Sequence, residues 1–220
     1  MKNTLKFVLF LLIVLAALNS YSQTFGLKGG LNRNDVLYEN ASGNLSDIAD
    51  MTMQGFHVGA TMENLFSEVV SLESGLFVSL KSFKLDEYLD GVAVRNKTYL
   101  YYLDIPIALK TKFDLGATSK WFVAAGPVID IGFAGNQIST YNWHGDGQAV
   151  KEKIEWGNNE GEINRFDVGL TFGAGVEFNL WQVGVYYDFG LTDISSDTNP
   201  ENTIKNRLWK LSVGYKLGSK

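Results

Sequence analysis

The chain has 220 residues, a formal net charge of −5 and no cysteine. The negative charge argues against nucleic acid as a partner, and the lack of thiols excludes disulfides and thiol chemistry. Only three prolines accompany 23 glycines, five tryptophans, ten tyrosines and fourteen phenylalanines. This composition is typical of a β protein with many tight turns.

Residues 1–22 have the features of an export signal. Two lysines precede an apolar run at residues 7–18, and the small residues Ser20 and Ser22 follow it. The run is shorter than the roughly 20 residues that a transmembrane helix needs. With no cysteine present, a lipoprotein anchor is also excluded. We therefore expect a signal peptide that is cleaved after Ser22 and a mature domain over residues 23–220.

The mature chain contains eight segments in which apolar and polar residues alternate, the period-2 pattern of half-buried β-strands. In chain order they are residues 25–32, 54–63, 70–83, 99–110, 121–133, 166–178, 181–192 and 205–217. The sixth and seventh show the pattern most strongly, and Asn179 and Leu180 between them fit a two-residue hairpin turn. This turn makes Phe178 and Trp181 direct partners and places the apolar residues of both segments on one face.

Three residues depart from the alternation. Phe77 falls on the polar side of the third segment. Pro106 and Pro127 lie inside the fourth and fifth segments, where each removes a ladder hydrogen bond. A barrel has no free edge to accommodate a proline, so we expect a β-bulge at each of these two positions.

The connections indicate on which side the apolar face lies. Long connections at 34–53, 84–98, 134–164 and 193–204 alternate with short ones at 64–69, 111–120 and 179–180. Outer-membrane barrels have long extracellular loops and short periplasmic turns, and their outward apolar band ends in aromatic girdles. We therefore predict an all-β fold, an eight-stranded antiparallel up-and-down transmembrane β-barrel in the cell outer membrane. The loop 134–164 is expected outside the cell.

The polar faces carry five bases and six acids that would point into the barrel. They are Lys28, Glu73, Lys81, Asp104, Lys110, Asp130, Asp167, Glu177, Asp188, Lys210 and Lys216. Eight strands leave an interior just wide enough for side chains, and near-balanced charge favours mutually neutralising pairs over an ion path. Tyr186, which the hairpin register places opposite Gly173, adds to this filling. We interpret these charges as a structural network that plugs the lumen.

The sequence contains no recognisable catalytic, cofactor-binding or metal-binding motif. His57 is predicted to point inward, and since local sequence provides no serine or acid partner we interpret it as a hydrogen-bonding residue of the lumen. A histidine–serine pair at the lipid-facing rim would instead favour a lipid-modifying enzyme. The two separated histidines form no zinc motif, and the acids of residues 146–162 lack the spacing of a calcium loop.

Four segments resemble the outer-membrane β-barrel domain family common in Bacteroidetes, the PorT-like group. They are residues 25–32, 102–110, 166–178 and 211–217. The resemblance covers essentially the whole mature chain and implies an eight-stranded outer-membrane barrel. Some members of this group assist protein secretion or gliding, whereas most have no assigned activity. The family usually ends on an aromatic residue, whose place Leu217 takes here.

These patterns predict a small non-enzymatic barrel with a structural or interaction role at the cell envelope, with a link to protein secretion or surface attachment. Outer-membrane lipid is an expected partner, envelope and secretion proteins are candidate partners, and no cofactor is expected. Two alternatives stay open. One is a lipid-modifying enzyme of the outer membrane, and the other is a soluble periplasmic barrel that carries an apolar ligand.

Overall fold

The computed structural model describes residues 23–39, 53–89, 92–143, 146–157, 162–195 and 203–217, so the predicted signal peptide lies outside the described residues. Nine strands are present: β1 (Gln23–Glu39), β2 (Met53–Leu65), β3 (Val70–Leu89), β4 (Val92–Asp114), β5 (Ser119–Trp143), β6 (Asp146–Lys153), β7 (Phe166–Phe178), β8 (Trp181–Gly190) and β9 (Thr203–Leu217). Within this described part, no helix has the length and apolar character needed to cross a membrane.

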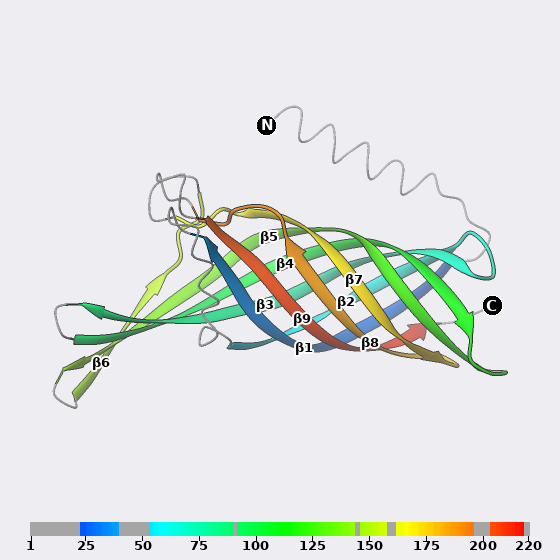
Figure 1. Ribbon diagram of the computed structural model, residues 1–220, viewed down its shortest axis with the longest axis horizontal. Coiled ribbons are helices and arrows are strands. Elements are labelled where there is room, and N and C mark those ends of the chain that lie inside the picture. Colours follow the sequence, from blue (N-terminus) through cyan, green and yellow to red (C-terminus); the bar gives the residue numbers. More distant parts are fainter. Residues whose placement is uncertain are drawn as a thin grey trace.

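Eight of the nine strands close into a ring. Each pairs antiparallel with its neighbours in the order β1, β2, β3, β4, β5, β7, β8, β9, and β9 returns to β1. The strands lie oblique to the long axis of the molecule (Figure 1). The predicted eight-stranded antiparallel barrel is therefore confirmed, and β6 is an additional strand outside the ring that pairs with the far part of β5.

The apolar residues of β7 and β8 face away from the lumen. Phe178 pairs with Trp181, as predicted, and every second residue of β7 from Phe166 onward is exposed. The alternate residues Asp167 and Glu177 are buried. An apolar exterior around a charged interior is the reverse of a soluble barrel, so the alternative of a soluble ligand carrier is wrong.

Aromatic pairs mark two levels on the outer face. At one end, Phe113 stacks on Trp121 at a centroid distance of 4.2 Å, and Trp181 meets Tyr215 at 5.0 Å. At the other end the pairs are Tyr101 with Phe133 at 6.3 Å and Tyr187 with Trp209 at 4.7 Å. Such girdles lie at the two interfaces of a membrane, so the apolar band between them fits the hydrocarbon region.

The short connections lie together at one end of the barrel, which we call the short-turn end. Residues 66–69, 115–118 and 179–180 join consecutive strands there. Asn179 has φ near 50°, a left-handed conformation that asparagine tolerates in tight turns. In the first turn, the Ser67 hydroxyl accepts hydrogen bonds from the backbone of Val69 and Val70. All three lie within the predicted short connections, and the first two are shorter than predicted.

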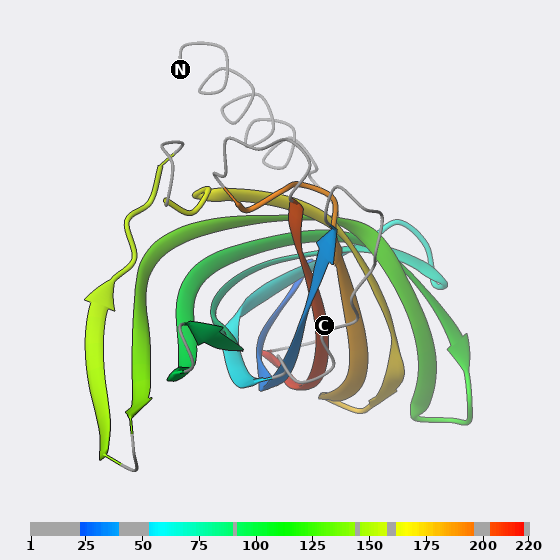
Figure 2. The same ribbon diagram turned by 60° about the vertical axis from the view of Figure 1, so that its left-hand side comes forward.

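At the opposite end, two predicted long loops are largely strand. β3 and β4 continue through the 84–98 region as a hairpin in which Leu89 pairs with Val92. β5 runs to Trp143 and pairs with β6 inside the 134–164 region. These two hairpins, which we call the hairpin extension, project past the ends of the other strands (Figures 1 and 2). Lipid imposes no alternation beyond the membrane, so the sequence pattern ends before the strands do.

The predicted bulges at the prolines are wrong, and the structure has a bulge at Phe133 instead. Pairing skips two positions beside Pro106 but resumes in the same register, because a proline removes a donor without adding a residue. In contrast, Tyr101 pairs with Ala134 and Tyr102 with Gly132, which leaves Phe133 as an extra residue. The bulge reverses which residues of β5 face outward beyond this point.

Candidate functional site

The predicted lumen charges all lie on the inner side of the ring, in two clusters. The short-turn cluster consists of Lys28, Glu63, Glu73, Lys110, Lys112, Glu177 and Lys216. The hairpin-end cluster consists of Lys81, Asp104, Asp130, Asp167, Asp188 and Lys210. Each residue comes from the polar side of an alternating strand, so the strand period alone directs it inward.

Lys110 is the centre of the short-turn cluster and has 0% exposure. Its Nζ donates to Glu177 at 2.5 Å, to Glu73 at 3.0 Å and to the side-chain oxygen of Gln182 at 3.1 Å. Lys28 forms a further ion pair with Glu73. A single buried ammonium thus has three acceptors from three different strands, which compensates for the loss of its hydration.

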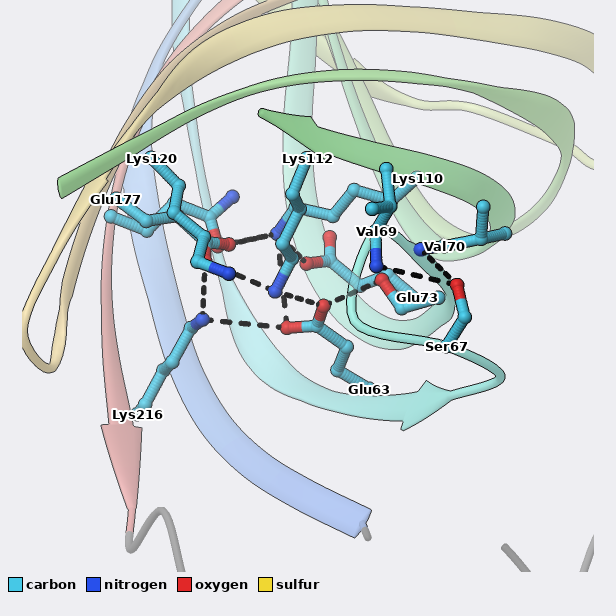
Figure 3. A network of polar contacts seen from close by, with 12 residues as sticks. Glu63, Ser67, Val69, Val70, Glu73, Lys110, Lys112, Lys120, Glu177 and Lys216 are labelled. Atoms are coloured by element: carbon cyan, nitrogen blue, oxygen red, sulfur yellow. Dashed lines mark hydrogen bonds and ion pairs between the residues drawn. The ribbon is translucent and has the colours of Figure 1, made fainter. Parts of the chain in front are cut away.

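Glu63 and Lys112 belong to this cluster but were missing from the predicted set. Glu63 pairs with Lys112 and, at 3.5 Å, with Lys216, while Lys112 reaches Glu177 at 3.0 Å. Figure 3 shows these side chains converging from β2, β4, β7 and β9. The alternation could have identified both, because residues an even number apart on a strand point to the same face. Glu63 follows the inward His57 by six residues, and Lys112 follows Lys110 by two. Lys112 was missed because the fourth predicted segment ended too early.

Aromatic rings fill the lumen beside the short-turn cluster. The Lys110 ammonium lies 4.3 Å from the centroid of Phe122, and Gln182 donates to the Tyr186 hydroxyl at 2.7 Å. Tyr186 stands opposite Gly173, as predicted, and its ring occupies the space that a Cβ there would need. Charged groups and aromatic rings therefore occupy the lumen together at this level.

The hairpin-end cluster has a different composition. Asp104 pairs in register with Asp130, and Asp130 with Asp167, so three carboxylates lie side by side across β4, β5 and β7. Lys81 reaches Asp130 at 2.5 Å and Asp104 at 3.8 Å, and Lys210 pairs with Asp188. Asp167 accepts hydrogen bonds from two neutral groups at 2.6 and 2.7 Å. Among the described residues, no acid group has the geometry of a metal site.

A small cavity separates the two clusters. Its volume is about 40 Å³, and its lining includes Lys28, His57, Phe77, Asp104, Tyr186, Lys210 and Ser212. Such a volume holds a few water molecules and no lipid chain. Phe77, the exception to the alternation, is buried here with its ring edge-on to His57 at a centroid distance of 5.9 Å. Phe77 therefore points inward because its ring packs against other side chains in the lumen.

His57 lies at the middle of a hydrogen-bond chain. Its Nδ1 is 2.6 Å from the Asn32 side-chain oxygen, and its Nε2 is 2.7 Å from the Ser212 hydroxyl. The Asn32 amide nitrogen donates to the Phe56 carbonyl at 3.0 Å, which turns the amide oxygen toward His57. His57 therefore carries its proton on Nδ1 and accepts from Ser212 through Nε2. Sequence reasoning missed Ser212 because it lies on β9, far along the chain.

The order serine, histidine, asparagine matches the order of groups in a nucleophilic triad. The serine that would favour a lipid-modifying enzyme was expected at the lipid-facing rim. Ser212 is instead 5% exposed and faces the small cavity, and His57 is 4% exposed. The backbone around Ser212 pairs with β1 and β8, so its amides belong to the ladder and do not form an oxyanion hole. Ser212, His57 and Asn32 therefore have the hydrogen bonds of a triad, but they lie in a place that a lipid ester does not reach.

Comparisons with known proteins agree with this architecture. The family model described as "Outer membrane protein beta-barrel domain" matches residues 21–196, which is most of the chain. The chain belongs to this family, and its place is the outer membrane. No curated protein matches the sequence.

Several solved structures also resemble the chain. OprG from Pseudomonas aeruginosa has 11% identity and a TM-score of 0.46, with 92% of this chain and 99% of that chain covered. Neisserial surface protein A has 14% identity and a TM-score of 0.42, with 88% and 96% covered. Ail of Yersinia pestis, in complex with the heparin analogue sucrose octasulfate, has 14% identity and a TM-score of 0.39, with 89% and 99% covered.

Proposed function

We propose that this member of the outer-membrane β-barrel domain family is a non-conducting, non-enzymatic barrel that holds an interaction surface outside the cell. The observation that carries this proposal is the short-turn cluster, in which four bases and three acids from opposite walls pair across the lumen. A barrel closed in this way does not pass solutes, so its role lies in what it anchors.

The hairpin extension is the part that supports an interaction role. β6 is the last strand of the sheet within the described residues, and it pairs only with β5 there. An edge strand presents backbone donors and acceptors, which another chain can extend by β-augmentation. Residues 149–153 of β6 are exposed and include Lys151 and Lys153. We take envelope proteins as the partners, and the PorT-like resemblance favours secretion or surface attachment as the process.

The orientation follows from the same proposal and is tested first. With the short-turn end in the periplasm, trypsin added to intact cells should cut after Lys151 or Lys153, which are exposed. Cutting that occurs only after the cells are broken would place the hairpin extension inside and end the proposal.

The interaction role is tested by shortening one hairpin at a time. Replacing residues 140–149 by Asn-Gly leaves Ser139 paired with Val150 and removes the tip of the β5–β6 hairpin. Replacing residues 86–95 by Asn-Gly is the matched control, since Leu85 stays paired with Asn96. Cross-linking on intact cells should give a partner adduct that the first variant loses and the control keeps. An adduct that survives both changes would show that the hairpin extension is not the interaction surface.

A second candidate function, hydrolysis by Ser212, is favoured by one observation, its 2.7 Å contact with His57. The two functions make opposite predictions for a fluorophosphonate probe, which labels activated serines. We expect no labelling of the folded barrel in lipid vesicles, because Ser212 is buried. Labelling that is lost in both Ser212→Ala and His57→Gln would establish the enzyme instead.

A further inference from the structure

A groove of about 350 Å³ runs over the outer face of the barrel, across β8, β9, β1 and β2. Two cross-strand rows form its outward lining. In the first row, Val185 pairs with Leu211, which pairs with Leu31. In the second row, Trp209 pairs with Arg33, which pairs with Gln54. The groove therefore has an apolar part and a polar end.

The girdles give the depth of this groove in the membrane. Trp209 belongs to the aromatic pairs at the hairpin end, through its contact with Tyr187. Arg33 stands directly beside Trp209, so it lies at the level of lipid headgroups. Leu31 and Leu211 lie two residues nearer to the short-turn end and are 65% and 52% exposed, which places them at the level of acyl chains.

Arg33 is an exposed cation that has no charged residue as a cross-strand partner. Its two cross-strand partners, Trp209 and Gln54, are uncharged. Among the residues whose side chains the structure describes, Arg33 has no ion pair. In the register of β1 with β9, Asp35 stands opposite Arg207. Arg207 itself donates to the Gly190 carbonyl at 3.0 Å and lies over the Phe189 ring.

We propose that this groove binds a phosphate-bearing lipid of the outer leaflet. The lipid phosphate accepts hydrogen bonds from the Arg33 guanidinium, whose planar fork matches phosphate oxygens. The Gln54 amide and the Trp209 indole provide further donors at the same level. An acyl chain of the lipid lies along Val185, Leu211 and Leu31. This inference does not depend on the proposed partner of the hairpin extension.

The test is a titration of the refolded, detergent-solubilised barrel followed by native mass spectrometry. The probe is lipid A with two phosphates, compared with the same lipid after removal of its phosphates. We expect Arg33→Gln to weaken binding of the phosphorylated probe about fivefold, the effect of one basic residue near an anionic surface. Removing the phosphates should weaken binding to the unchanged protein to a similar extent, and should not weaken it further in Arg33→Gln.

Two controls keep the result specific. Lys120→Gln makes the same change of charge at the short-turn end, where Lys120 pairs with Asp114 at 3.3 Å, and should leave binding unchanged. Leu211→Asn should weaken both probes equally, because it disturbs only the acyl contact. Folding of each variant is checked by its gel mobility before and after heating.

Three results would overturn the proposal. The first is unchanged binding in Arg33→Gln. The second is an equal loss in Lys120→Gln, which would mean diffuse attraction by net charge. The third is a loss confined to Lys84→Gln and Lys97→Gln. These lysines stand opposite each other in the β3–β4 hairpin, so this result would move the phosphate site there.

Discussion

The two charge clusters of the lumen differ in composition and in how well their members are paired. The short-turn cluster has four lysines and three glutamates, and Lys110 by itself lies within ion-pair distance of all three acids. The hairpin-end cluster has four aspartates and two lysines, and Asp104 and Asp130 each keep one oxygen without a hydrogen-bond partner among the described residues. The long side chains span the lumen, whereas the short ones stay near their own wall.

This difference suits the short-turn cluster to a role as a structural plug, whereas the hairpin-end cluster has more acids than bases. In the short-turn cluster each charge is compensated by groups on another strand, so removing one leaves others buried without a counter-charge. In the hairpin-end cluster, removing one acid reduces an existing surplus. Equal chemical changes should therefore have unequal effects at the two levels, which a comparison of Glu177→Gln with Asp130→Asn tests.

The largest effect is expected for Glu177→Gln in the short-turn cluster. Glu177 pairs with Lys110, Lys112 and Lys216, so the change leaves four buried or half-buried lysines with two acids. Breaking a buried pair of this kind costs about 3–5 kcal/mol. Urea unfolding of the barrel in lipid vesicles measures this loss. Glu68→Gln, in an exposed turn at the same end, is the matched control and should change stability by less than about 0.5 kcal/mol.

The next effect compares the apolar band of the barrel with the hairpin extension. Val185 is 47% exposed on the apolar band, where an arginine costs about 2–4 kcal/mol near the bilayer midplane. Val150 is 44% exposed on the hairpin extension, and Val150→Arg should cost less than about 0.5 kcal/mol in the same unfolding assay. Equal costs at the two sites would mean that the apolar band does not face lipid.

Gly184→Ser is a poor comparison for Val185→Arg, although the sequence favours it. The alternation places Gly184 in the lumen, where a small polar group would be expected to find hydrogen-bond partners. A Cβ at Gly184 would lie 2.9 Å from the Tyr186 ring and 3.1 Å from Phe122. The serine would therefore displace a packed ring, so tolerance of this change is not expected.

The smallest effect is expected for Asp130→Asn in the hairpin-end cluster. Lys81 keeps Asp104 as a counter-charge at 3.8 Å, and the asparagine oxygen still accepts a hydrogen bond. We expect a loss of about 1 kcal/mol or less, close to that of one hydrogen bond. A loss as large as that of Glu177→Gln would contradict the distinction between the two clusters.

Much of this architecture could be predicted from the sequence because a membrane barrel imposes alternation on every strand. The rule places Lys110, Glu177 and Asp167 inside and Phe178 and Trp181 outside without any knowledge of neighbours. Beyond the membrane no lipid imposes the alternation, so β6 and the outer parts of β3 and β4 gave no signal. The bulge at Phe133 left no signal either, because an aromatic residue at this level is equally expected in a girdle on a strand without a bulge.

Which inward residues meet across the lumen could not be predicted from alternation. His57 and Ser212 are on strands that do not pair with each other, and their contact depends on the shear and diameter of the closed ring. The Arg33 groove likewise depends on the register of β1 with both β2 and β9. A one-residue shift in either pairing would replace its partners, Gln54 and Trp209.

Single-channel recording on the purified protein in a planar bilayer tests the central claim, that paired side chains close the barrel. We predict no reproducible conductance steps from the unchanged protein, since the short-turn cluster and Tyr186 leave no continuous water column. Discrete open steps that disappear in Asp188→Asn or Lys210→Met would contradict the account. They would show that the lumen charges line a conducting path instead of filling it.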